Sequence, residues 1–197
     1  YSEKDTFNMA CRGCASKFPA NNLEIALLEA GLKTICNSPE DAVEITETKS
    51  NEHLLQSVDG FPALVGAPWL NGRLIAMHAC SDLWARGARV VSAQAIVVLP
   101  FLKQKIQQEL LKQTLLGVQS VLTPQGASLV GGHTFEARSH APSPPSLGLE
   151  VSLSVNGVVD SARDPWGKQG LKAGDALLIS RAIGSGVLFA AAMQDSV

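Results

Sequence analysis

Hydrophobic residues along the chain follow two periods, one typical of helices and one typical of strands. Apolar positions recur every three to four residues over 23–30, 70–86 and 102–122, which predicts three amphipathic helices. A continuous apolar run over 90–99, bounded by glycine and proline, is typical of a buried strand. Further strands are predicted over 41–46, 53–58, 127–130, 147–155 and 176–180, and a last helix is predicted from residue 187.

Capping residues and helix-breaking residues mark where several of these elements begin and end. Asn21 and Asn22 are predicted N-caps of the first helix, and Gly31 is its predicted stop. Gly87 ends the second helix in the same way. The stretch 137–147 contains three prolines and three serines, which predicts a loop.

The glycine and proline residues that interrupt the pattern also indicate how the chain divides into domains. Residues 1–20 are polar and mixed, which predicts a mobile N-terminal segment. Residues 21–157 carry most of the predicted helices and strands and form the expected main domain. Residues 158–197 contain a linker and then a new strand-and-helix pattern, so we expect them to form a linker and the truncated start of a second domain.

Composition narrows the class of protein. Hydrophobic residues make up 46% of the 197 residues and charged residues 17%, which favours a well-packed globular protein over a disordered one. The net charge of −2 comes without a basic cluster, so no nucleic-acid partner is expected. The apolar stretches are too short for a membrane span, and no secretory signal is recognisable, so we expect no membrane partner and a cytoplasmic location.

The cysteine pattern argues against a zinc site or a dithiol. Cys11 and Cys14 form a C-x-x-C, but a second ligand pair and a thioredoxin-like context are both missing. Reduced thiols, as in a cytosolic protein, are the simpler interpretation.

Cys14 has a more specific feature, because Lys17 follows three residues later and Gly13 precedes it. A nearby ammonium lowers a thiol pKa and increases the thiolate fraction, so the pair is a candidate nucleophile; the alternative is a surface cysteine near a surface lysine.

Three carboxylates are candidates for binding magnesium and phosphate. Asp41 begins a predicted strand, Asp59 ends one in a glycine-containing turn, and Asp82 lies on the predicted helix over 70–86. Mg²⁺ takes one or two carboxylates together with phosphate oxygens and water. The alternative interpretations are turn capping for Asp59 and an exposed helix position for Asp82.

A glycine pair after a predicted strand is a candidate phosphate site. In Gly131-Gly132-His133-Thr134, the missing side chains let backbone N–H groups approach an anion closely; a plain turn is the alternative. The chain contains no Walker-type G-x-x-x-x-G-K-[ST], and no G-x-G-x-x-G follows the early strands.

Taken in order, these motifs resemble those of a known family. They are Gly13-Cys14-Ala15-Ser16-Lys17, Glu40-Asp41-Ala42-Val43, Ser57-Val58-Asp59-Gly60-Phe61, Asn71-Gly72-Arg73, Cys80-Ser81-Asp82-Leu83, Gly131-Gly132-His133, Gly174-Asp175 and Gly184-Ser185-Gly186-Val187-Leu188. The series is similar to selenophosphate synthetase (selenide, water dikinase), in the aminoimidazole ribonucleotide synthetase superfamily. The pair Cys14 and Lys17 separates this resemblance from the purine- and thiamine-pathway members of the superfamily.

The resemblance implies a fold and an activity. The fold would be α/β (α+β): a synthetase-like N-terminal domain with a mixed sheet flanked by helices, followed by the truncated start of a second α/β domain. The reaction would convert ATP, selenide and water into selenophosphate, AMP and phosphate, with Mg²⁺ as cofactor, in a homodimer that binds ATP near its interface. The residues implied are Cys14 and Lys17 for catalysis, Asp41 and Asp82 for Mg²⁺, and Lys17, Ser38, Pro39, Glu40, Asp59, Asp82, Gly131, Gly132 and His133 for ATP.

The chain also departs from the family pattern. Ser16 stands where many members have a second cysteine, and Glu40-Asp41 stands where they have two aspartates. A further metal-binding aspartate of the family lies beyond Val197, so the chain by itself is expected to lack a complete site. These details resemble a subgroup fused to a flavin-dependent NADH dehydrogenase-like domain. Two alternatives stay open: another small-metabolite kinase or ligase of the superfamily, or a non-catalytic nucleotide-binding and dimerisation module fused to a redox enzyme.

Overall fold

The computed structural model describes residues 20–31, 42–47, 52–137, 148–160 and 162–193. The chain divides into two compact units, each described by itself below. One unit is residues 40–168 and contains the sheet and its two covering helices. The other unit combines residues 1–39 with residues 169–197, and its described residues include two further helices.

The sheet of the first unit has five strands in the order β1-β2-β5-β3-β4. Neighbouring strands are antiparallel except for β3 and β4, which are parallel and are joined through helix α4. A parallel pair needs such a crossover, whereas antiparallel strands can be joined by a short turn. The strands are β1 (Val43–Glu47), β2 (Glu52–Pro62), β3 (Arg89–Leu99), β4 (Ser128–Glu136) and β5 (Glu150–Asp160).

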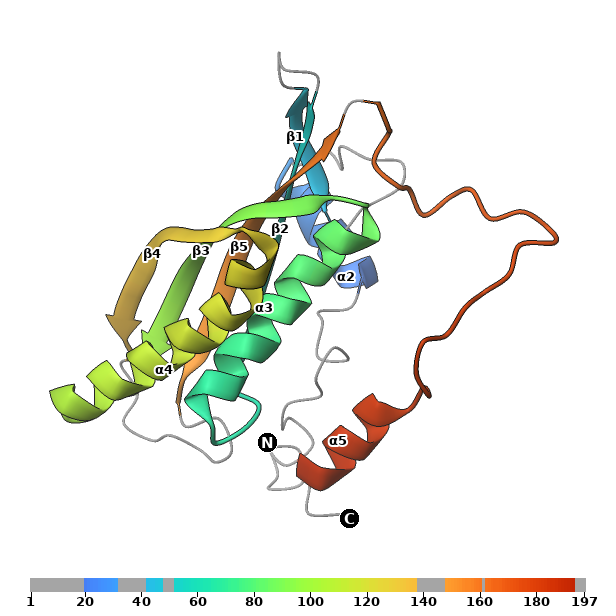
Figure 1. Cartoon of the computed structure of the whole chain (residues 1–197). Helices are drawn as coiled ribbons and strands as arrows, with labels where there is room; N and C mark the ends of the chain where they lie inside the picture. Colours follow the sequence, from blue (N-terminus) through green and yellow to red (C-terminus); the bar gives the residue numbers. More distant parts are fainter. Residues whose placement is uncertain (1–19, 32–41, 48–51, 138–147, 161, 194–197) are drawn as a thin grey trace. The chain divides into compact units, whose positions relative to one another are not determined.

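Two helices lie side by side across one face of this sheet, α3 (Pro68–Ala85) and α4 (Gln104–Leu122) (Figure 1). Strand residues alternate between this covered face and the opposite one, as the period of two requires. The covered face and the helices enclose the core, whose largest fully buried apolar side chains are Leu55, Ile75, Leu83, Val90, Val97, Val118, Leu122, Leu149, Leu153 and Val155. The predicted α/β class, a mixed sheet with flanking helices, is therefore confirmed.

Helices α3 and α4 approach closely at two glycines. A Cβ built on Gly72 would lie 2.0 Å from the carbonyl oxygen of Thr114, and one on Gly117 would lie 2.0 Å from the carbonyl oxygen of Trp69. Neither contact leaves room for a side chain, so the two backbones themselves form the interface at these positions.

The ends of α3 are fixed by local chemistry. Pro68 begins the helix, where its missing N–H costs nothing. The buried Asn71 accepts hydrogen bonds from the N–H groups of Leu64 and Val65 and donates to the carbonyl of Val65, which holds the preceding loop. Gly87 ends the helix with a φ of 74°, as predicted.

Three predicted strand boundaries in this unit are wrong. Strand β5 continues past the predicted end at residue 155 to Asp160, because its last residues pair with β2. Strand β2 continues through Asp59 and Gly60 to Pro62, because all eleven of its residues pair with β5 without a break. Asp59 therefore lies inside a strand and not in a turn. Strand β4 likewise continues through the glycine pair to Glu136, paired with β3. The glycines consequently belong to a strand and do not form the loop expected for a phosphate cradle.

The second unit holds α2 (Ala20–Glu29) and α5 (Ser185–Met193). Asn21 and Asn22 lie within α2, so their prediction as N-caps is wrong, whereas Gly31 does end the helix with a φ of 74°. The strand predicted over 176–180 is also absent from the described residues. A strand needs a hydrogen-bonding neighbour, and the described part of this unit supplies none.

Candidate functional site

Strand β2 and helix α3 bring two predicted carboxylates to the same boundary between sheet and helix. Ser57 and Asp59 point toward the helices, because they alternate with the exposed Val58. His78 and Asp82 are four residues apart and so lie on one side of α3. The Ser57 hydroxyl donates a 2.7 Å hydrogen bond to Oδ2 of Asp82, and Oδ1 of Asp59 lies 3.8 Å from Nε2 of His78.

Both carboxylates remain accessible to a ligand. The Asp59 side chain is 21% exposed and the His78 side chain 36%, and Asp82 is half-buried. The ring of Phe61, the next inward residue of β2, meets the His78 ring edge-on with centroids 5.9 Å apart. His78 was not among the predicted site residues, although its spacing of four from Asp82 was a usable signal.

A pocket of about 230 Å³ lies beside Asp82. Ala42, which follows Asp41 directly in the chain, lines it together with Arg86 at the end of α3. Trp166 forms another wall: its ring packs against Gly87, and its backbone N–H donates to the carbonyl of Arg86 at 3.1 Å. Asp82 and Arg86 therefore bring a carboxylate and a guanidinium to one pocket, and these are groups that can contact a cation and a phosphate.

The donors at this position suit a hard cation such as Mg²⁺. Asp82 and Asp59 present carboxylate oxygens, and Ser57 orients one oxygen of Asp82. No group of three or more metal-ligating side chains occurs within the described ranges. A cation bound there would depend on phosphate oxygens and water for its other ligands, which is the usual mode for Mg²⁺.

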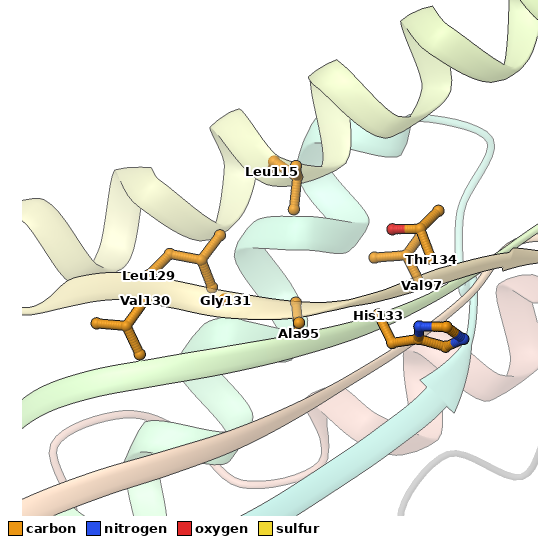
Figure 2. A pocket seen from close by; sticks show the side chains of 9 residues that line it. Ala95, Val97, Leu115, Leu129, Val130, Gly131, His133 and Thr134 are labelled. Carbon is orange, nitrogen blue, oxygen red and sulfur yellow. The ribbon is translucent and has the colours of Figure 1, made fainter.

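The glycine pair lines a separate pocket of about 370 Å³, between β4, β3 and helix α4. Figure 2 shows Leu115 projecting from α4 toward the strands, with Leu129 and Thr134 on the same side of the sheet. Gly132 is required by packing, because a Cβ there would lie 2.0 Å from the carbonyl oxygen of Ala95. His133 points away from α4, and its ring lies 5.6 Å from that of Phe135.

Asp59 and Gly132 are far apart within one chain. In the strand register Asp59 pairs with Leu153, Leu153 with Ala95, and Ala95 with Gly132. Three interstrand spacings separate the carboxylate from the glycine, which is roughly 14 Å. One phosphate group cannot contact Asp59 and Gly132 of the same chain.

The remaining predicted site residues lie outside the described residues. They are Cys14, Lys17, Ser38, Pro39, Glu40 and Asp41.

The face of the sheet opposite α3 and α4, called the open face below, mixes polar and apolar side chains. In its middle, the Gln56 amide donates to Ser154 and Asn156 at 3.1 and 3.2 Å. Val58 and Ile96 are exposed on either side of this network, with exposed fractions of 69% and 49%. A sheet face that gathers several exposed apolar side chains is a candidate association surface, whereas single exposed apolar residues are ordinary. Towards β4, the open face also carries exposed Val130 and Phe135.

Cys80 has surroundings that make it unreactive. It is fully buried in α3, and burial raises the pKa of its thiol to about 11. A neutral buried thiol is a poor nucleophile, so Cys80 is not a candidate for nucleophilic chemistry.

A family model covers most of the first unit. Residues 39–159, more than half of the chain, match the family described as AIR synthase related protein, N-terminal domain. No helix among the described residues has both the length and the apolar character needed to cross a bilayer.

Individual relatives agree with this match. A curated protein of Nitratidesulfovibrio vulgaris (strain DP4), named selenide, water dikinase, is 34% identical over 150 residues, which are 76% of this chain and 39% of that protein. The crystal structure of tt0281 from Thermus thermophilus matches with a TM-score of 0.57 at 22% identity, covering 78% of this chain and 47% of that one. Thiamine monophosphate kinase from Aquifex aeolicus has a TM-score of 0.54 at 17% identity, covering 73% and 44%.

These structures share the fold of the chain, which spans less than half of the length of each of these three proteins. The resemblance carried by the short motifs is therefore confirmed over most of the chain.

Proposed function

Because the chain belongs to the family of AIR synthase related proteins through its N-terminal domain, we propose that its protein makes selenophosphate from ATP, selenide and water, releasing AMP and phosphate. The substrate choice is supported by the 34% identical relative that is named for this reaction.

The observation that carries the proposal is the placement of Asp59 and Asp82. The two carboxylates come from different elements, face the same boundary between β2 and α3, and stay open to solvent. Phosphoryl transfer is catalysed mainly by positioning and by neutralising charge on the phosphates. Carboxylates in this arrangement can hold the cation that neutralises that charge.

The metal site is proposed to combine Asp82 with Asp41. Ala42, the neighbour of Asp41 in the chain, lines the pocket of Asp82 and supports this pairing. Mg²⁺ held there would withdraw negative charge from the phosphates. Ser38, Pro39 and Glu40 directly precede Asp41 and are proposed, with Asp59, to contact the nucleotide.

Cys14 and Lys17 are proposed to supply the selenium chemistry. A thiolate at Cys14 suits a soft atom such as selenium, and the Lys17 ammonium can stabilise charge on a phosphoryl oxygen. The buried, neutral Cys80 supports giving this role to Cys14.

We propose further that two copies associate through the open face and share each nucleotide. The exposed Val58 and Ile96 support this surface. The separation of roughly 14 Å between Asp59 and Gly132 supports the sharing, because one chain cannot bring both to one phosphate. Each ATP would then contact the carboxylates of one copy and the segment Gly131–His133 of the other.

Phosphorus NMR of the full-length protein with ATP, Mg²⁺ and selenide tests the reaction. We expect a selenium-bonded phosphate and AMP, both absent without selenide and both lost in Cys14→Ala. ADP formed without any response to selenide would indicate another kinase of the superfamily. Nucleotide binding without turnover would indicate a non-catalytic module.

A further inference from the structure

We propose that the pocket beside Asp82 binds the inorganic phosphate that the reaction releases, and that Arg86 and Lys168 supply the positive charge that attracts it. The inference rests on the proposed function, since it names the site of one product of that reaction. It gives a role in binding to Arg86 and Lys168, which belong to none of the sequence motifs.

The pocket has the charge and the size for one phosphate group. Its lining includes the Asp82 carboxylate, the Arg86 guanidinium and the Lys168 ammonium, so the cations outnumber the anion. A guanidinium binds phosphate oxygens through paired N–H donors, and a lysine ammonium acts as a point charge. The volume of about 230 Å³ is below the range of roughly 300–1,000 Å³ that larger small-molecule ligands need. A small anion therefore fits better than a whole nucleotide.

Hydrogen bonds hold the segment that carries Trp166 and Lys168 against the end of α3. The chain turns after β5, where the N–H of Arg163 donates to the carbonyl of Asp160 at 2.9 Å. The N–H of Trp166 then donates to the carbonyl of Arg86 at 3.1 Å. Lys168 follows two residues later and lines the same pocket as Arg86, although β3, α4, β4 and β5 separate the two in the chain.

The carbonyl groups at the end of α3 are engaged in hydrogen bonds, which weakens their repulsion of an anion. A helix C-terminus carries partial negative charge on its unpaired carbonyl oxygens. Here the carbonyl of Trp84 accepts from the N–H of Gly87 at 2.9 Å, and the carbonyl of Arg86 accepts from Trp166. The indole of Trp166 also lines the pocket and limits water on that side, which strengthens the attraction between charges.

The Asp82 carboxylate makes phosphate binding depend on a cation. By itself this carboxylate would repel phosphate, whereas Mg²⁺ held by Asp82 would remove that repulsion. Arg86 and Lys168 attract the anion directly in either case. Phosphate should therefore bind more tightly with Mg²⁺ than without it, and should depend on both cationic side chains.

Equilibrium binding of radiolabelled inorganic phosphate to the full-length protein tests the inference. With Mg²⁺ present, Arg86→Gln and Lys168→Gln should each raise the Kd for phosphate by roughly tenfold or more, the effect of losing one charged hydrogen-bonding partner. Lys168 is exposed, so its substitution does not put folding at risk. Arg89→Gln is the matched control and should leave this Kd unchanged, because Arg89 is exposed nearby in the chain and does not line the pocket.

AMP provides a second control, titrated by calorimetry. Its affinity should stay unchanged in Arg86→Gln and Lys168→Gln, because its phosphate is a different one from the phosphate that is released.

The outcomes distinguish this inference from the proposed function. Unchanged phosphate affinity in both Arg86→Gln and Lys168→Gln, or no phosphate binding by the unsubstituted protein, would reject the pocket and leave the proposed function intact. An equal loss of phosphate and AMP binding would also overturn the inference, because the nucleotide's own phosphate would then occupy the pocket. Weaker phosphate binding in both variants of a protein that makes no selenophosphate would support the pocket and reject the proposed function.

Discussion

Ser57 on β2 and Asp82 on α3 are joined by a 2.7 Å hydrogen bond between the serine hydroxyl and Oδ2 of the carboxylate. The bond links the sheet to the helix at the position where the proposed metal site lies. It also fixes one carboxylate oxygen and leaves the side chain half-exposed. A carboxylate oriented in this way loses less conformational entropy when it binds a cation.

The first prediction concerns this bond. Ser57→Ala should raise KM for MgATP by roughly tenfold, because a hydrogen bond to a charged group contributes about 1.5–3 kcal/mol. Ser81, the neighbour of Asp82 in the chain, donates instead to the carbonyl of His78, so Ser81→Ala is the control. Steady-state kinetics measures both variants. A KM that rises equally in the two would show that Ser57 has no specific role.

The second prediction tests the sharing of nucleotides between copies. Asp82→Asn and His133→Ala should each abolish or strongly reduce activity, in opposite halves of the shared site. Unfolding and refolding the two variants together should restore about a quarter of wild-type activity, because half of the dimers are mixed and each has one intact site. If both halves of a site come from one chain, mixing will restore nothing.

The third prediction concerns packing between α3 and α4. Gly117→Ala should lower the free energy of unfolding by about 1–3 kcal/mol, because the added Cβ would lie 2.0 Å from the carbonyl oxygen of Trp69. Urea denaturation measures the change. Gly66→Ala is the control, since nothing lies within 4 Å of a Cβ built there. Equal stability of the two variants would contradict the close approach of the helices.

The fourth prediction is a pH dependence from Cys80. Burial raises the pKa of this thiol from 9.0 to about 11, so the folded state keeps a proton that the unfolded state loses first. The stabilisation is fully present below pH 9 and is lost as pH rises toward 11. Wild type should therefore lose stability more steeply than Cys80→Ala over this range, measured by urea denaturation. Parallel curves would show that the thiol titrates normally.

Iodoacetamide labelling checks the same thiol by an independent route. At pH 8 the folded protein should leave Cys80 unlabelled, and urea should make it reactive.

The hydrophobic period and the helix-breaking residues of the sequence were sufficient to predict the long helices and strands. The helix ending at Gly87 and the strand over 90–99 agree with α3 and β3 within two residues at each end. Their patterns are strong because each element buries one side against the core. The same local signals failed at Asp59 and Gly131, where a glycine in the sequence indicated a turn. Pairing with β5 and β3 keeps both segments extended instead.

The sequence by itself determined which chemical groups the chain carries: carboxylates, a glycine pair, and a thiol near a lysine, in the order of their family. Only the tertiary structure decided which of these groups meet. Asp82 lies beside Ser57 and not beside Gly132, because β2 and α3 pack together while three interstrand spacings separate β2 from β4. Such distances depend on strand order and helix packing, which are formed by contacts between residues far apart in the chain. Local periodicity holds no information about them.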